Sequence, residues 1–126
     1  MSEEVMMEIQ MLEQHMNQMQ QHIQGLDEKI AEAQQLGKSL DELKVVKPGE
    51  EIMIPISNGI FATGKLTDVS KMRVNVGSGV VVEKTLEGTQ ALVEKQVVAM
   101  KKLKEQSQEQ FQKLVDHAQE LMQKIE

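Results

Sequence analysis

The sequence is nearly free of aromatic residues and entirely free of cysteine. Two Phe are the only aromatic side chains among its 126 residues, and Trp, Tyr and Cys are absent. Because large aromatic side chains usually anchor a compact core, their scarcity argues against a conventional globular enzyme. The lack of Cys excludes disulfides, thiolate metal ligands and a cysteine nucleophile, and it fits a reducing compartment.

Long apolar runs and concentrated positive charge are also missing. No apolar stretch approaches the roughly 18 residues of a membrane span, and the acidic start Met1-Ser2-Glu3-Glu4 is unlike a basic targeting peptide. We therefore expect a soluble, cytoplasmic chain with no membrane partner. The net charge of -6 resides mainly in residues 1–44, and Arg73 is the single arginine. Nucleic-acid binding, which needs a concentrated basic surface, is disfavoured.

The first third of the chain has a heptad pattern of apolar residues. Its a and d positions hold Val5, Ile9, Leu12, Met16, Met19, Ile23, Leu26, Ile30, Ala33, Gly37 and Leu40. This spacing predicts a coiled-coil helix over residues 2–44, capped by Ser2 and ended before Pro48. A bend remains an alternative, because Gly37 weakens the helix and Ser39 could begin a capping box.

Residues 50–84 change to the two-residue period of β-strands. Two alternating runs, one of Ile and one of Met and Val, each lead into a turn signal, Asn58-Gly59 and Gly77-Ser78-Gly79 respectively. The pattern predicts two β-hairpins. Their apolar residues are Ile54, Ile56, Ile60 and Phe61 in the first hairpin and Val74, Val76, Val80 and Val82 in the second.

The heptad pattern returns in residues 85–126, with Thr85 as the expected N-cap. Lys104 and Ser107 interrupt it at an a and a d position. Buried polar residues can specify coiled-coil register, whereas a stutter would turn both side chains to solvent. We favour the stutter, because the sequence identifies no acidic partner for Lys104.

The two helices are of equal length and can fold back antiparallel, each covering the apolar stripe of the other. No helix is then left to cover the hairpins, whose Ile- and Val-rich edges recruit further strands. The fold class is therefore α+β, an antiparallel coiled coil with two inserted hairpins. We expect an obligate oligomer whose hairpins pair between subunits.

This order of elements resembles the α class of the prefoldin family, which has two hairpins where the β class has one. The stretch from Ile54 to Phe61 is similar to the family's Val-Pro-x-Gly-x-Gly-x-Phe, although Ser57 replaces a Gly. Residues 74–84 are similar to its Val-x-Val-Gly-x-Gly-x-x-Val-Glu-Lys. The resemblance covers the whole chain in topology, so residues 1–126 would form one prefoldin-like domain.

The resemblance implies a chaperone subunit that works without ATP. Two α and four β subunits would form a hexamer, with the hairpins joined in β-barrels between subunits. The coiled-coil tips would hold non-native proteins and pass them to a group II chaperonin. No cofactor is expected, because Gly77 and Gly79 lie in a hairpin turn without the Gly-Lys-Ser/Thr of a phosphate loop. No metal site is expected, since His15 and His22 lack zinc-clamping spacing.

Apolar residues at the helix ends are the candidate client-binding residues. Met6, Met7 and Met11 lie off the heptad seam, and antiparallel pairing brings Leu121, Met122 and Ile125 to the same end. Methionine is flexible and is common on promiscuous binding surfaces. Burial against a neighbouring subunit and ordinary exposure are the alternative interpretations. For the whole chain, the alternative function is a structural coiled-coil adaptor, and an enzyme is disfavoured.

Overall fold

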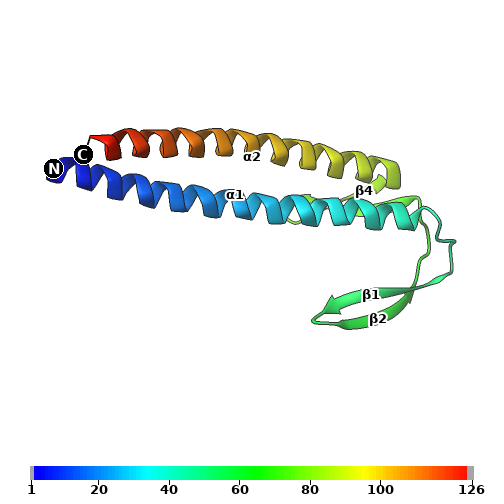
Figure 1. Cartoon of the computed structure of the whole chain (residues 1–126). Helices are drawn as coiled ribbons and strands as arrows, with labels where there is room; N and C mark the ends of the chain where they lie inside the picture. The colour runs from blue at the N-terminus through cyan, green and yellow to red at the C-terminus, as the bar shows by residue number, and fades with distance from the viewer. Residues whose placement is uncertain (1, 125–126) are drawn as a thin grey trace. The chain divides into compact units, whose positions relative to one another are not determined.

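The computed structural model describes residues 2–124, which form two long helices with two hairpins between them (Figure 1). In chain order the elements are α1 (Glu3–Leu43), β1 (Glu51–Ser57), β2 (Ile60–Lys65), β3 (Lys71–Gly77), β4 (Val80–Thr85) and α2 (Leu86–Gln123). The chain divides into two compact units. We call residues 1–32 with 96–126 the helical unit and residues 33–95 the hairpin unit.

The burial of α1 confirms the predicted heptad pattern. Each of its predicted a and d residues, from Val5 to Leu40, is buried or half-buried, while most residues between them are exposed. The helix continues through Gly37, and the Ser39 hydroxyl donates a hydrogen bond to the Gln35 carbonyl at 3.1 Å. Ser39 therefore bonds within the same helix instead of capping a new one.

Both helices begin with the predicted caps. The Ser2 hydroxyl accepts a hydrogen bond from the Val5 N–H at 3.2 Å. The Thr85 hydroxyl accepts one from the Gly88 N–H at 2.9 Å, and the Thr89 hydroxyl donates to the Thr85 carbonyl at the same distance. The bonds accepted by Ser2 and Thr85 satisfy N–H groups that the first turn of a helix leaves unpaired.

The stutter predicted at Lys104 and Ser107 is wrong. Ser107 is buried, and the Lys104 ammonium lies 2.5 Å from a carboxylate oxygen of Asp27. Both residues thus keep their seam positions. Asp27 lies on α1 and Lys104 on α2, far apart in the sequence. The antiparallel pairing of the two helices in the helical unit brings this acidic partner to Lys104.

Polar contacts within each unit show this antiparallel direction. In the helical unit, Glu8 near the start of α1 meets His117 near the end of α2 at 3.2 Å. In the hairpin unit, a carboxylate oxygen of Asp41 accepts a hydrogen bond from the Gln90 side-chain amide at 2.7 Å. Within each unit, the two helices therefore run in opposite directions, as predicted.

The two hairpins are separate two-stranded antiparallel sheets with the same local design. The turn residues Asn58 and Gly59 have φ values of 50° and 79°, and Ser78 and Gly79 have 52° and 75°. These left-handed conformations match the twist of paired strands, as Asn-Gly predicts. In both hairpins the register shifts just before the turn, at Pro55/Ser57 and at Asn75/Gly77.

The expectation that no helix covers the hairpins is wrong for the second one. The core of the hairpin unit consists of Leu40, Leu86 and Val93, and Met72 of β3 packs against it. Ala33 and Leu43 complete the cluster. The last turns of α1 and the first turns of α2 therefore shield part of the β3–β4 hairpin.

A short connector between the hairpins is fixed by Asp68. One of its carboxylate oxygens accepts hydrogen bonds from the Ser70 hydroxyl at 2.6 Å and from the Ser70 N–H at 2.8 Å. These two bonds lower the pKa of Asp68, the hydroxyl bond contributing most, and the charge of Lys71 adds to the effect. The Ser70 carbonyl in turn accepts the N–H of Leu86 at 3.3 Å. The connector thus links β2 to the start of α2.

Among residues 2–124, neither helix has a stretch apolar enough to cross a membrane.

Candidate functional site

The first turns of α1 and the last turns of α2 lie side by side in the helical unit (Figure 1). His117 stands between two carboxylates: its Nε2 is 3.2 Å from Glu8 and its Nδ1 is 4.0 Å from Glu120. Beside the seam, the two helix ends are thus held together by contacts between polar side chains. The apolar side chains outside the seam take no part in these contacts.

Four methionines at these helix ends are exposed, namely Met6, Met7, Met11 and Met122. Met7 and Met11 are 63% and 69% exposed, and their i, i+4 spacing places them on the same face of α1. None of the four occupies a seam position. The structure therefore brings together these candidate client-binding residues from both helices.

The remaining two candidates differ. Leu121 is only 4% exposed, so it belongs to the seam that holds α2 on α1, not to the accessible surface. Its d position in the heptad already predicts this burial. Ile125 lies outside the residues that the structure describes. Among the described candidates, the exposed group therefore consists of the methionines alone.

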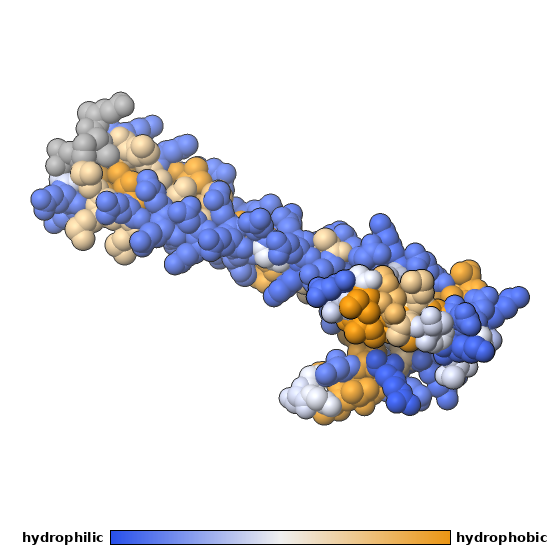
Figure 2. Space-filling view, turned by 90° about the horizontal axis from the view of Figure 1, so that it is seen from below, coloured by the Kyte–Doolittle hydropathy of each residue, from blue (hydrophilic) through white to orange (hydrophobic). Residues whose placement is uncertain are grey.

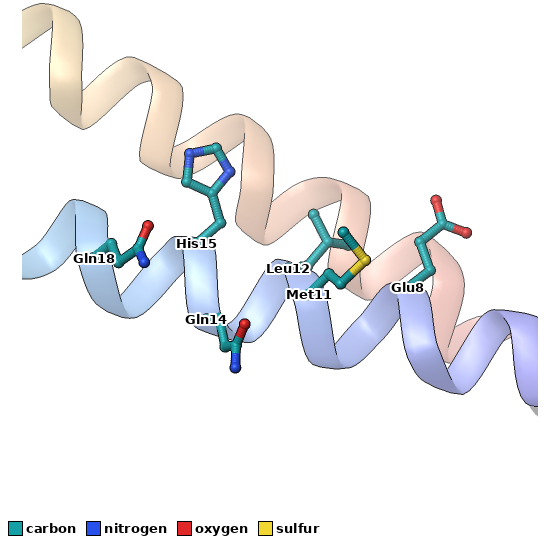
Figure 3. A pocket seen from close by; sticks show the side chains of 6 residues that line it. All are labelled: Glu8, Met11, Leu12, Gln14, His15 and Gln18. Atoms are coloured by element: carbon teal, nitrogen blue, oxygen red, sulfur yellow. The ribbon is translucent and has the colours of Figure 1, made fainter.

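A pocket of about 390 Å³ lies along α1 beside Met11 (Figure 3). Its lining residues are Glu8, Met11, Leu12, Gln14, His15 and Gln18. Leu12 is a half-buried seam residue, whereas Met11 and the glutamines are exposed. The pocket thus combines apolar contact with side-chain amides that can donate and accept hydrogen bonds. Its open, flexible lining suits variable peptide segments better than one rigid ligand.

The hairpins carry the second candidate surface, an apolar one (Figure 2). All four apolar candidates of the first hairpin, Ile54, Ile56, Ile60 and Phe61, are exposed. In the second hairpin Val76 and Val80 are exposed, whereas Val74 and Val82 pair across the strands and are half-buried. Exposed apolar surface of this kind marks interaction sites.

Two further exposed apolar residues on the hairpins were missed by the sequence reasoning. Met53 on β1 directly precedes the selected Ile54, and Val81 on β4 directly precedes the selected Val82, so each faces the opposite side of its strand from that neighbour. The signal was the unbroken runs Ile52-Met53-Ile54 and Val80-Val81-Val82. A strand that is apolar at consecutive positions has two apolar faces. Both faces of the first hairpin therefore carry exposed apolar side chains, whereas the second hairpin exposes Val81 on the face opposite to Met72 and Val82.

The side chains of the helix ends and of the hairpins are suited to reversible, noncovalent contacts. Within residues 2–124, no three His, Asp or Glu side chains come together as a metal site. Methionine and valine contribute apolar area without directional bonding, and methionine adapts its shape to the partner. The helix ends and the hairpins are thus suited to binding protein surfaces.

Comparison with known proteins places the chain in a family. The family model described as "Prefoldin subunit" matches residues 4–126. The chain is 32% identical over 83 residues to prefoldin subunit alpha of Methanobrevibacter smithii, covering 66% of this chain and 56% of that protein. It is 31% identical over 83 residues to human prefoldin subunit 5, covering 60% of this chain and 54% of that one. The chain thus matches little more than half the length of these curated relatives.

A solved structure shows the same fold. The match is a chain from the cryo-EM structure of filamentous PFD from Methanocaldococcus jannaschii, with a TM-score of 0.81 and 18% sequence identity. The alignment covers 90% of this chain and 94% of that chain. Two long helices with a two-hairpin insert are therefore a known architecture. The match to the family model over residues 4–126 identifies the family. The chain belongs to the prefoldin family.

Proposed function

We propose that this chain is the α-class subunit of a cytoplasmic, ATP-independent prefoldin chaperone. It assembles with β-class subunits as a hexamer of two α and four β chains, binds non-native proteins at its helix ends and passes them to a group II chaperonin. Family membership supports this proposal, as do the two hairpins and the archaeal relatives named prefoldin subunit alpha.

The observation that carries the proposal is the exposed methionine group at the helix ends. Met6, Met7, Met11 and Met122 contribute nothing to the seam, which is already complete without them. Covering one such side chain contributes about 1–2 kcal/mol. Several weak contacts of this kind, repeated on neighbouring coiled coils, give useful avidity without a strong single site.

The exposed hairpin residues support the assembly part of the proposal. An isolated two-stranded hairpin is only marginally stable in water. Here Ile56, Ile60 and Phe61 of the first hairpin are exposed in the single chain. Strands from other subunits, added as an inter-subunit β-barrel, would cover this surface and pair the free edges.

The test is to replace Met6, Met7 and Met11 together by Ser in the complex assembled with β-class subunits. The a/d seam stays intact, so helical content and native mass should be unchanged. Suppression of client aggregation should weaken several-fold, because apolar contact area at the helix ends is lost. Light scattering of an unfolding client and native mass spectrometry provide the two measurements.

The matched control replaces Val98 and Leu103 of α2 by Ser. Both are exposed apolar residues off the seam, and both lie many turns before Met122. This control should hold clients normally. If the methionine variant holds clients normally but its subunits dissociate, these methionines are interface residues and the binding assignment fails. If the unmodified complex suppresses no aggregation, the structural adaptor is the better function.

A further inference from the structure

All the sulfur in this chain is thioether sulfur, because ten residues are Met and none is Cys. The described methionines fall into two groups. Met6, Met7, Met11, Met53 and Met122 are exposed. Met16, Met19, Met72 and Met100 are half-buried, three of them in the helix seam and Met72 against the hairpin-unit core. Four of the five exposed residues are at the helix ends.

Exposed methionine reacts with peroxide. The sulfur lone pair attacks one peroxide oxygen, an S–O bond forms as the O–O bond breaks, and the proton on the transferred oxygen passes to the departing hydroxide, which leaves as water. The sulfur is oxidised by two electrons to the sulfoxide while the peroxide is reduced. The product is polar at the atom that previously made apolar contact, and methionine sulfoxide reductases reverse the reaction.

We infer that Met6, Met7, Met11 and Met122 form a modification site at which peroxide switches off client binding. The inference rests on the proposed function, since it assumes that these side chains contact clients. Met7 and Met11 are neighbours on one face of α1, so their oxidation places two new polar oxygens side by side. Because all four side chains are methionine, the same reaction makes each of them polar, and the surface as a whole becomes less apolar.

The seam should survive the same treatment. Met16 and Met19 lie between α1 and α2 and are half-buried, so their sulfurs are less accessible than those of the outer methionines. The Lys104–Asp27 and His117–Glu8 contacts contain no sulfur. Oxidation at the helix ends therefore changes the binding surface while the coiled coil and the assembly stay intact.

The experiment uses the chain assembled with its β-class subunits, treated with hydrogen peroxide and freed of it before the client is added. Peptide mass spectrometry should find sulfoxide first at the four helix-end methionines. Suppression of aggregation should fall several-fold, while the native mass still corresponds to the intact complex plus the added oxygens and the circular dichroism spectrum is unchanged. Treatment with methionine sulfoxide reductases should restore it.

A variant with Leu at residues 6, 7, 11 and 122 is the matched control. Leucine has no sulfur, so the level of client holding measured for this variant before treatment should be the same after peroxide. A Met53→Leu variant should remain as peroxide-sensitive as the unmodified chain, because residue 53 lies on a hairpin.

The results separate the two ideas. If the Ser variant loses client holding but the oxidised complex keeps it, the switch is wrong and the proposed function stands. If the Ser variant holds clients normally, the proposed function fails and the switch fails with it. If the four-Leu variant is as peroxide-sensitive as the unmodified chain, the reactive site is elsewhere and the inference is overturned.

Discussion

At the residue scale, a polar layer interrupts the apolar seam of the helical unit. Lys104 at an a position pairs with Asp27, and Ser107 at the next d position is buried. The two partners of the ion pair are partly hydrated, with side chains 30% and 51% exposed. Such a layer contributes little stability, but it penalises any alignment of the helices that separates Lys104 from Asp27.

We predict that Lys104→Leu stabilises the coiled coil and loosens its register. Continuing the apolar seam should add about 1 kcal/mol and raise the thermal midpoint measured by circular dichroism. Register can be followed by disulfide trapping between Glu8→Cys and His117→Cys, because the natural chain contains no Cys. Trapping should become less complete in the Leu variant. A lower midpoint would show that the ion pair, not apolar burial, dominates at this layer.

Asp68 gives a second residue-scale prediction, concerning pH. Hydrogen bonds from Ser70 lower its pKa below the ordinary value of 3.8. Because the charged form is favoured in the folded chain, its stabilising effect is complete above pH 3.8 and is lost as the pH falls through the lowered pKa. The Ser70 amide resonance in an NMR titration should therefore shift with a midpoint below that value.

The control for this titration is Asp68→Asn, which keeps a side-chain oxygen as acceptor but cannot ionise. Its Ser70 resonance should show no such step. A midpoint at or above 3.8 in the natural chain would mean that the connector bonds do not favour the charged carboxylate.

At the element scale, the two hairpins use one turn geometry with two sequences. Asn58-Gly59 and Ser78-Gly79 have nearly the same pairs of positive φ values. Asparagine tolerates the left-handed region well, whereas Ser has no such preference. In the second hairpin, the first Gly of the family's Gly-x-Gly pattern is Gly77, which has a φ of 122°. In the first hairpin Ser57 occupies the corresponding position, and its φ is not positive. The first turn therefore forms without that glycine.

We predict that Ser78→Asn stabilises the second hairpin by up to about 1 kcal/mol, because it relieves part of the cost of a left-handed residue. The reciprocal change, Asn58→Ser, should destabilise the first hairpin by a similar amount. Denaturant midpoints of the assembled protein provide the measurement. Ser78→Val should act opposite to Ser78→Asn; if both valine and asparagine are neutral, the turn does not limit hairpin stability.

Most elements could be predicted from the sequence because their signals are local. A heptad places Leu26 and Ile30 in the seam without knowledge of the partner, and Asn58-Gly59 specifies its own turn. The errors concern contacts between residues distant in sequence. Nothing near Lys104 identifies Asp27, and nothing near Met72 identifies the core of Leu40, Leu86 and Val93.

The candidate site likewise has features that follow from local sequence and features that do not. The outer positions of Met7 and Met11 follow from helical geometry, so their exposure could be predicted. Leu121 is the client-binding candidate whose heptad position is d, and its burial places it in the seam. Which partner covers the hairpins depends on other chains, which this sequence does not contain.

At the scale of the whole molecule, the exposed apolar residues of the hairpins bear on the proposed assembly. We predict that Val76→Asp disperses the assembly with little loss of helical content, because a carboxylate cannot be buried between strands without a partner. Native mass spectrometry and circular dichroism test the two parts. Val45→Asp is the matched control, since Val45 is 81% exposed in the segment after α1 and belongs to no hairpin. An unchanged native mass for Val76→Asp would contradict assembly through the hairpins.

The uneven burial of the α1 seam has a consequence for motion. Every seam residue from Val5 to Ile23 is only half-buried, whereas Leu26 and Ile30 are buried. Local opening follows the stability of local contacts, so amide hydrogens in the first turns should exchange with solvent before those around Leu26. Fraying there would uncover Leu12 and Met16 and so add to the apolar surface of the methionines that are already exposed. If the helix ends bind clients as proposed, we expect a strongly apolar client to open these first turns and gain the contact area of the seam, and a weakly apolar client to leave them closed.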